Sequence, residues 1–389
     1  MRATVEQLAG FSNRAPCSDA ERRAALWLHD DLRARGHEAW VETVWVRPQW
    51  AASLLLHSTL GVVASLLSTA APLPALVLAA LVALSYGLEA TGRGGLLRLL
   101  FFRRATQVVV VEPPDPDRIA LLITANTDAP RQGIAFRDGL RRMGARLGRG
   151  RLPTSLGWVV LALAGVAAAA GARAAGAEGP AVGAPQFVPT LLLLLAAAVA
   201  LDAALSNQST GAGDDASGVA VACALHEALV RTPPAHLSPG LLLAGAGEAF
   251  PLGLAALLRR ERPAPAATVV LEIGPCAGGD PAYSARVGVL FPGRLHHQLA
   301  AACEWTAAEL PDLGVRPAAL RRPSATLAAR SRRLPAVGVR AVDDAGVPSR
   351  SRTPRDTLEH VDDEALARTL QFCLAMVDVL DADLGVTAD

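Results

Sequence analysis

The sequence contains no lysine, so all 37 residues counted as Lys or Arg are arginines. We interpret this as codon bias in a GC-rich genome, because a functional constraint would not remove every lysine. The formal net charge is only +1, which predicts no nucleic acid or other polyanionic partner. The five cysteines are scattered without a CxxC pair, so we expect neither a disulfide framework nor a cysteine-rich zinc site. Residues 1–16 lack an apolar run, and no signal peptide is expected there.

Aromatic residues are also scarce, at 4%, although hydrophobic residues reach 51% and the mean hydropathy is +0.31. The excess is alanine, leucine and valine, a composition typical of helices packed in lipid. Four long apolar stretches occur in two pairs, at 51–71 and 73–90 and then at 155–172 and 187–205. Each is about long enough to cross a hydrocarbon core of roughly 30 Å. They predict two transmembrane hairpins, 50–90 and 154–206, with a loop between the second pair.

Buried core helices are the alternative for these stretches, but such helices seldom run this long without a polar face. The arginines predict the topology. Residues 91–151 carry twelve of them, whereas the hairpin tips carry only Arg173. The positive-inside rule therefore places the hairpin tips on the outer side of the cell membrane. It places both termini and the chain segments outside the hairpins in the cytoplasm.

A basic segment follows within residues 133–151. Its apolar residues Phe136, Leu140, Met143 and Leu147 recur at helical spacing, and arginines take the other faces. This pattern is typical of a helix lying on anionic headgroups. A solvated, glycine-containing basic linker is the alternative, and the sequence does not decide between them.

The remaining pieces read as alternating helices and strands. Ser18 and Glu21 form a capping box that begins a helix ending at Gly36. Strands are predicted at 39–46, 107–111, 119–125, 241–244, 268–273 and 337–342, and further helices at 216–230, 252–259, 295–310 and 363–380. This alternation predicts an α/β fold with a mixed, largely parallel sheet between helices. Ligands of such sheets bind beyond the carboxyl ends of the strands.

Five polar segments occur in a distinctive order. Four are interpreted as lying just after strands, ITANTDAP (123–130), GAGDDASGVA (211–220), AGAGEAFPLG (244–253) and LEIG (271–274), and the fifth, SRTPRDTLEHVD (351–362), precedes the last helix. Each alone has an ordinary explanation, since paired aspartates before a helix commonly act as caps. Together, they resemble metallopeptidase family 28, the co-catalytic zinc aminopeptidases and glutaminyl cyclases. The opening stretch RAPCSDAERRAALWLHDDLRARG resembles the first helix of that family.

The resemblance implies a site with two zinc ions, bridged by one carboxylate and a water molecule. Asp214 matches the bridging aspartate, and Glu248 matches the general base. Glu272 matches a terminal carboxylate ligand. Asp128 matches the aspartate that orients the first ligand histidine, and Asp356 keeps its place in the DT motif.

Three ligand positions of the family are substituted. Asn126 replaces the first histidine, Ala249 replaces the second glutamate of the GEE motif, and Arg352 replaces the final histidine. Zinc prefers imidazole, thiolate and carboxylate ligands, and an arginine stays charged in proteins. We therefore expect Arg352 to repel a metal and to pair with Asp214 or Glu248.

The resulting hypothesis is a membrane-anchored pseudopeptidase that has lost its zinc and works by binding or scaffolding. Its peptidase-like domain comprises 1–49, the strands within 91–153, and 207–389, and its partners are the lipid bilayer and a peptide or protein in the cleft. An enzyme with altered chemistry is one alternative, because Asn126, Asp214 and Glu272 offer oxygen ligands to one weakly bound divalent cation. An ordinary zinc aminopeptidase is the other.

Overall fold

The computed structural model describes residues 1–148, 157–290 and 292–386. The chain forms two compact units. The first comprises 1–48, 103–132 and 207–389, and the second comprises 49–102 and 133–206. Each unit is thus assembled from separate stretches of chain. Arg149, Arg151 and the predicted start of the second hairpin at residue 154 lie outside the described residues.

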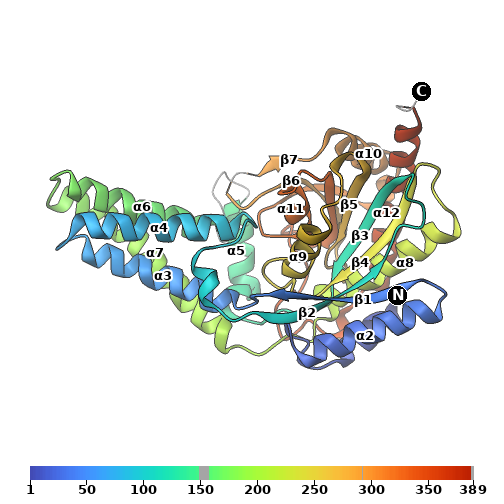
Figure 1. Cartoon of the computed structure of the whole chain (residues 1–389), viewed down its shortest axis with the longest axis horizontal. Coiled ribbons are helices and arrows are strands. Elements are labelled where there is room, and N and C mark those ends of the chain that lie inside the picture. The colour runs from blue at the N-terminus through green and yellow to red at the C-terminus, as the bar shows by residue number, and fades with distance from the viewer. Residues whose placement is uncertain (149–156, 291, 387–389) are drawn as a thin grey trace. The chain divides into compact units, whose positions relative to one another are not determined.

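A nine-stranded sheet forms the centre of the first unit, in the order β1-β2-β4-β3-β5-β9-β6-β7, with β8 beside β6 (Figure 1). Its central strands β4, β3, β5 and β9 run parallel, whereas β1 and β2 on one side and β6 and β7 on the other pair antiparallel. The mixed sheet with a parallel centre confirms the predicted α/β fold. The strands are β1 (Ala39–Val46), β2 (Arg104–Val111), β3 (Ile119–Asn126), β4 (Leu237–Ala244), β5 (Thr268–Ile273), β6 (Asp280–Val287), β7 (Gly293–Arg294), β8 (Arg316–Leu320) and β9 (Ala336–Val342).

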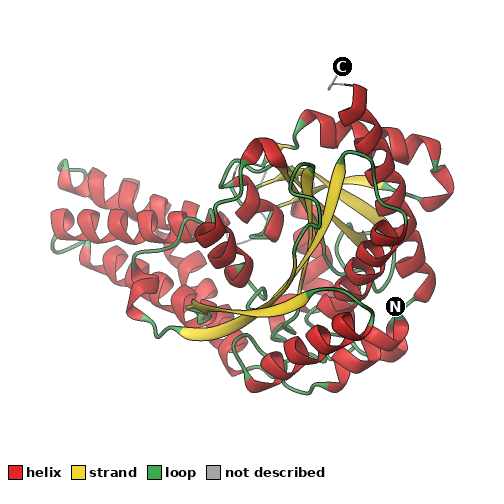
Figure 2. Cartoon of the chain, turned by 45° about the vertical axis from the view of Figure 1, so that its right-hand side comes forward, coloured by secondary structure: helices red, strands yellow, loops and turns green. Residues whose placement is uncertain are grey.

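Helices cover both faces of this sheet (Figure 2). On β2, Val109 and Val111 join one apolar core, whereas Val108 and Val110 join the other, because alternate residues of a strand point to opposite faces. The helices of the first core are α1 (Arg2–Gly10), α2 (Asp19–Ala34), α8 (Gly218–Arg231), α10 (His297–Glu309) and α12 (Asp363–Val386). The second core lies under α9 (Leu252–Glu261) and α11 (Ala325–Arg330).

Helix α2 begins as the capping box predicts, but only one half of the box is present. The Ser18 hydroxyl accepts a hydrogen bond from the Glu21 amide at 3.1 Å. The Glu21 carboxylate accepts instead from the Cys17 amide at 2.9 Å, and it also contacts β2. The Glu21 carboxylate therefore accepts hydrogen bonds from other groups than the Ser18 amide that the capping-box pattern predicts.

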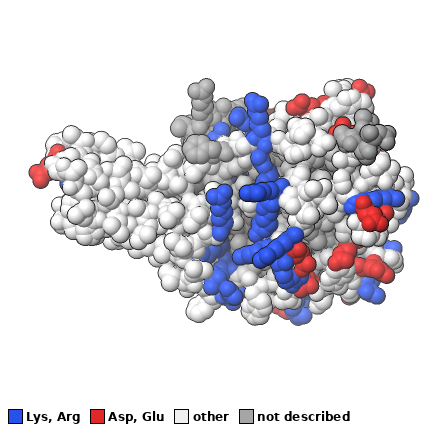
Figure 3. Space-filling view, turned by 45° about the horizontal axis from the view of Figure 1, so that its top comes forward, with Lys and Arg blue, Asp and Glu red and all other residues white. Residues whose placement is uncertain are grey.

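The second unit contains four long helices, α3 (Trp50–Leu67), α4 (Pro72–Ala90), α6 (Gly157–Ala174) and α7 (Pro180–Leu205), packed against one another. All four are long and apolar enough to cross a membrane, judged by length and composition. In Figure 3 this bundle presents a surface almost without charge, except near its tip. Helix α3 packs closely on its neighbours at Gly61. A Cβ atom added there would lie 2.5 Å from Leu163 and 2.8 Å from Leu193, so no larger residue fits without a shift.

The predicted loop before residue 187 is wrong over its second half, since α7 already begins at Pro180. Proline fits the first helical turn, where its missing amide hydrogen has no partner to lose. Gln186, which the sequence reading left in the loop, is buried in the helix and donates to the Ser65 carbonyl at 2.8 Å. Pro185 and Pro189 both lie within the helix, which bundles of membrane helices tolerate.

The basic segment contains a helix, α5 (Asp138–Gly148), on which Leu140 and Met143 are exposed. The segment is therefore helical over these residues, and the interfacial interpretation stays a prediction. Several elements were not predicted by the sequence analysis. They are α1, β6, β7, β8, α11, the 3₁₀ helix η1 (Leu97–Leu100) and the irregular turn η3 (Ala212–Ser217).

Candidate functional site

The polar segments meet at the carboxyl ends of the parallel strands. Asn126, the last residue of β3, pairs in register with Ala244 of β4, and Thr124 pairs with Glu272 of β5. The loop that carries Glu248 follows β4 directly. Neighbouring parallel strands end at the same edge of a sheet, which is the usual place for ligand sites in this architecture.

Asp128 fixes the loop that carries Glu248. Its two carboxylate oxygens accept hydrogen bonds from the amides of Gly247 at 2.6 Å and Glu248 at 2.8 Å. Burial raises the pKa of Asp128, while the hydrogen bond from Gly247 opposes this rise. The side chain of Asn126 lies directly over Gly247, where an added Cβ would come within 2.2 Å of it. Gly247 is therefore required by the close approach of this amide.

Asp356 holds the turn that carries Asp214. It accepts hydrogen bonds from the Gly213 amide at 2.5 Å and the Asp214 amide at 3.3 Å. Burial, followed by the charge of Asp214, raises the pKa of Asp356 to about 7. The Asp214 carboxylate accepts a hydrogen bond from the hydroxyl of Ser351, so the residue at the bridging position has a protein partner.

Arg352 points inward toward Glu248. Its Nη1 atom lies 3.7 Å from Glu248 Oε1, and the two side chains are only 10% and 3% exposed. Its Nη2 donates a hydrogen bond to the Glu248 backbone carbonyl. Glu248 Oε1 also accepts from the Arg131 amide at 2.7 Å. The expected charge pairing is thus present with Glu248 as an ion pair, and the guanidinium hydrogen bond goes to the carbonyl.

Glu272 is hydrogen-bonded to the first turn of helix α11. Its Oε2 atom accepts from the Thr326 amide at 2.7 Å and from the Thr326 hydroxyl at 2.5 Å. Arg340 is buried nearby, and burial lowers its pKa to about 10, although Glu272 and Asp215 act in the opposite direction. Thr326 and Arg340 were missed by sequence reasoning, since neither belongs to a recognisable motif.

Arg14 is a buried cation beneath the site, and the sequence analysis assigned it no role. Its Nε donates to the Thr127 carbonyl at 2.6 Å and its Nη2 donates to the Gly211 carbonyl at 3.1 Å. Burial lowers the pKa of Arg14 to about 10, opposed by four nearby carboxylates. These are Asp128, Asp356, Asp215 and Glu21.

Glu21 connects three segments of the same region. Its carboxylate accepts hydrogen bonds from the Thr106 hydroxyl at 2.9 Å and the Ala246 amide at 2.7 Å. Burial, with the nearby charge of Asp128, raises its pKa. The capping-box pattern was the only sequence signal at Glu21, and it did not indicate this role.

The residues present do not fit the pair of zinc ions that the family resemblance implies. Among residues 1–148, 157–290 and 292–386, no three His, Cys, Asp or Glu side chains form a group that could hold a metal ion. Asn126 and Ala249 lack the required donors, and Arg352 brings a positive charge to the Glu248 carboxylate. Asp214 and Glu272 are both hydrogen-bonded to protein groups. We therefore derive no catalytic step through zinc.

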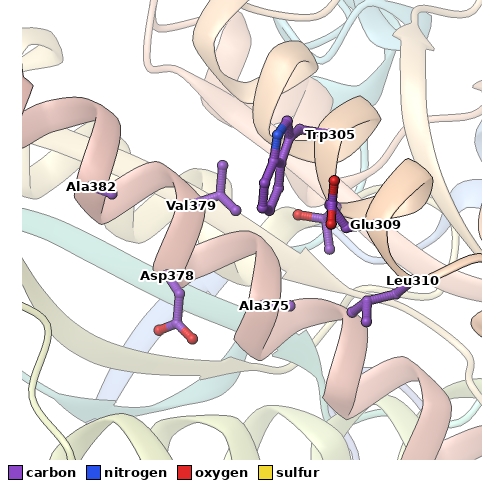
Figure 4. A pocket seen from close by; sticks show the side chains of 8 residues that line it. Trp305, Glu309, Leu310, Ala375, Asp378, Val379 and Ala382 are labelled. Carbon is purple, nitrogen blue, oxygen red and sulfur yellow. The ribbon is translucent and has the colours of Figure 1, made fainter.

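A cavity of about 450 Å³ lies elsewhere, against α10 and α12 (Figure 4). Its lining is mostly apolar and includes Trp305 and Val379, together with the carboxylates of Glu309 and Asp378. Burial, assisted by Asp381, raises the pKa of Asp378. None of the residues assigned by the sequence motifs lines this cavity.

No protein-family model and no curated protein matches the chain. Solved structures do match its fold. A glutaminyl cyclase from Bacteroides thetaiotaomicron, bound to N-acetylhistamine, has a TM-score of 0.54 at 10% identity over 97% of this chain and 96% of that one. A leucine aminopeptidase precursor from the same species has a TM-score of 0.54 at 11% identity, over 97% and 95%.

The LapA aminopeptidase of Legionella pneumophila has a TM-score of 0.51 at 11% identity, over 97% of this chain and 70% of that one. The identities are low, so these likenesses concern the fold. The chain has the peptidase-like α/β fold shared by these aminopeptidases and glutaminyl cyclases.

Proposed function

We propose that this protein is a membrane-anchored pseudopeptidase, which binds or scaffolds a partner and does not hydrolyse peptides. The observation that carries the proposal is the Arg352 guanidinium beside Glu248. In an active site of the family, that carboxylate would accept a proton from a metal-activated water. A permanent cation, with its Nη1 at 3.7 Å from Oε1, pairs with the carboxylate that would act as this base.

The absence of ligands at two further positions supports the same conclusion. Asn126 supplies a neutral amide, and Ala249 supplies no donor at all. The two carboxylates that remain at ligand positions are used in hydrogen bonds to Ser351 and Thr326. Buried carboxylates need such partners or a cation, and in this chain the protein itself supplies both.

The four apolar helices of the second unit support anchoring in the cell membrane. The arginine distribution supports an orientation with the peptidase-like unit and both termini in the cytoplasm. The partner that we propose for the retained fold is a peptide or protein segment.

Metal analysis of the purified, full-length protein tests the proposal. We expect no stoichiometric zinc and no cleavage of aminoacyl chromogenic substrates. The triple variant Asn126→His, Ala249→Glu, Arg352→His should gain zinc, because it restores two histidines and a glutamate at the ligand positions that accompany Asp214. Arg350→His, in the same loop but exposed, is the matched control and should gain none.

Two outcomes would overturn the proposal. About two zinc ions per natural chain, with chelator-sensitive hydrolysis, would establish an ordinary enzyme of the family. One bound Mg²⁺, Ca²⁺ or Mn²⁺ with hydrolysis that depends on it would establish the altered chemistry.

A further inference from the structure

The segment between α4 and β2 carries an exposed apolar edge. Leu96, Leu99, Leu100 and Phe102 are 49%, 62%, 71% and 84% exposed. We call these four residues the Leu96–Phe102 edge. Four large apolar side chains are thus exposed within seven residues, and exposed apolar surface concentrated in this way is a feature of interaction sites.

A buried ion pair holds this edge in place. Arg98, on the 3₁₀ helix η1, points into the second unit, where its Nη1 lies 3.1 Å from Glu89 Oε1. The two side chains are 8% and 1% exposed. The Ser53 hydroxyl donates to the other Glu89 oxygen at 2.8 Å. With three residues per turn, an inward Arg98 leaves Leu96, Leu99 and Leu100 on the outer sides of η1.

A second set of hydrogen bonds fixes the backbone of η1. The Leu97 amide donates to the Ser85 hydroxyl at 2.9 Å, and Ser85 contacts His57 Nε2 at 2.9 Å. His57 Nδ1 lies 2.7 Å from the Ser53 carbonyl, which assigns the ring hydrogen to Nδ1 and leaves Nε2 to accept from Ser85. The buried polar groups of α3 and α4 are therefore arranged to hold η1 against the helices.

We propose that the Leu96–Phe102 edge inserts into the boundary between headgroups and acyl chains of an anionic bilayer, beside the cytoplasmic end of α4. The proposal rests on the membrane anchoring proposed above. Leu96 follows the last residue of α4, Ala90, by six residues, a distance of about 20 Å at full extension. The pair between Arg98 and Glu89 holds η1 beside the last turn of α4, so the edge lies near the level at which the apolar helix ends.

Charge on both sides of the edge favours lipid over a protein partner. Arg93 precedes it, Arg103 and Arg104 follow it, and all three are exposed. Apolar side chains flanked by exposed arginines suit the acyl boundary below a layer of lipid phosphates. Helix α5, in the same unit, repeats this combination with exposed Leu140 and Met143 beside exposed Arg142.

Spin labels on the full-length protein in nanodiscs of phosphatidylcholine and phosphatidylglycerol test the insertion. The background is Cys17→Ser, because the four other cysteines are buried. Labels on Leu100→Cys and Phe102→Cys should collide readily with oxygen and poorly with a water-soluble nickel chelate. Leu195→Cys on α7 is the lipid reference, and Val230→Cys on α8 is the aqueous reference; both native side chains are exposed.

The outcomes separate this inference from the anchoring on which it rests. Edge labels exposed to the nickel chelate, with the Leu195 label in lipid, would overturn the insertion alone. A Leu195 label exposed to the chelate would overturn the anchoring. Edge labels shielded from both reagents would indicate a covering protein and would also overturn insertion into lipid.

A double variant tests the ion pair as the device that orients the edge. Glu89→Gln with Arg98→Gln removes both charges together, so no unpaired charge stays buried. We expect the label at Leu100 to become more mobile and more accessible to the chelate, while the label at Leu195 is unchanged. Arg93→Gln removes an exposed charge. This variant should leave the Leu100 label immobile and should only weaken the interaction of the protein with phosphatidylglycerol. An unchanged Leu100 label in the double variant would overturn the orienting role.

Discussion

At the scale of single residues, the carboxylates of the site lie near arginine side chains of the same protein. Arg352 lies beside Glu248, and Arg14 lies among four carboxylates. Ionised carboxylates this close together raise one another's pKa unless a cation is near. The family resemblance implies metal ions in this role, and here the Arg352 guanidinium lies beside the Glu248 carboxylate.

Arg352→Ala should therefore destabilise the first unit at neutral pH. Removing one partner of a buried pair leaves the other charge uncompensated, at a cost of about 3 kcal/mol. Urea unfolding in detergent would measure this cost, with the reactivity of the buried cysteines Cys223, Cys276, Cys303 and Cys373 as the signal.

Arg350→Ala is the matched control for this variant. Arg350 shares the loop and the positive φ of Arg352, 54° against 62°, but its side chain is exposed. We expect a change within about 0.5 kcal/mol. Equal losses of stability in the two variants would show that the backbone, and not the ion pair, determines the effect of Arg352→Ala.

At the scale of elements, carboxylates join the loops that follow the strands. Asp128 holds the loop after β4, Asp356 holds the turn before α8, and Glu21 ties α2 to β2 and to the same β4 loop. Burial raises the pKa of all three. The loops thus depend on acidic groups whose protonated form the fold favours.

This raised pKa predicts a pH dependence of the free energy of unfolding. For Asp356 the pKa rises from 3.8 to about 7, so the folded state binds the proton more tightly than the unfolded state does. The stability that the proton confers is complete below the unfolded pKa and is lost as the pH rises through about 7. Urea unfolding at pH values from about 4 to 8 should show this decline.

Asp356→Asn mimics the protonated side chain, so it should flatten the decline, although Asp128 and Glu21 still contribute. The matched control is Asp312→Asn, at an exposed aspartate of the same unit, and it should leave the slope unchanged. A free energy of unfolding that rises between about pH 4 and 7 would contradict the prediction.

At the scale of the whole molecule, two units are formed from interleaved stretches of one chain. Each stretch of the second unit lies between two stretches of the first unit in the sequence, so the chain leaves the first unit and returns to it. Under the membrane anchoring proposed above, two such insertions would place the three stretches of the first unit on one side of the membrane.

Impermeant maleimide labelling of intact cells should reveal this topology. In the Cys17→Ser background, Ala70→Cys and Glu178→Cys, at the two exposed tips, should react from outside. Ala382→Cys, near the C-terminus, should react only after the cells are permeabilised. Labelling of Ala382→Cys in intact cells would exclude the proposed orientation.

The sequence by itself determined the elements whose signal is local. Strands β1 and β5 match their predicted bounds, because continuous runs of β-branched and apolar residues mark them. The apolar stretches became α3, α4, α6 and α7, since length and composition alone distinguish such helices. The order of the polar segments also predicted which loops would meet, because parallel strands bring their carboxyl ends to one edge.

Only the tertiary structure decided which group each polar side chain meets. Glu272 accepts hydrogen bonds from Thr326, which is 54 residues away, and Arg352 pairs with Glu248, which is 104 residues away. The carboxylate of Glu21 accepts hydrogen bonds from Thr106 and Ala246, and not the capping-box hydrogen bond that the sequence predicts. Such partners depend on strand register and on the close packing of loops, which place atoms to within an ångström. No local pattern in the sequence carries that information.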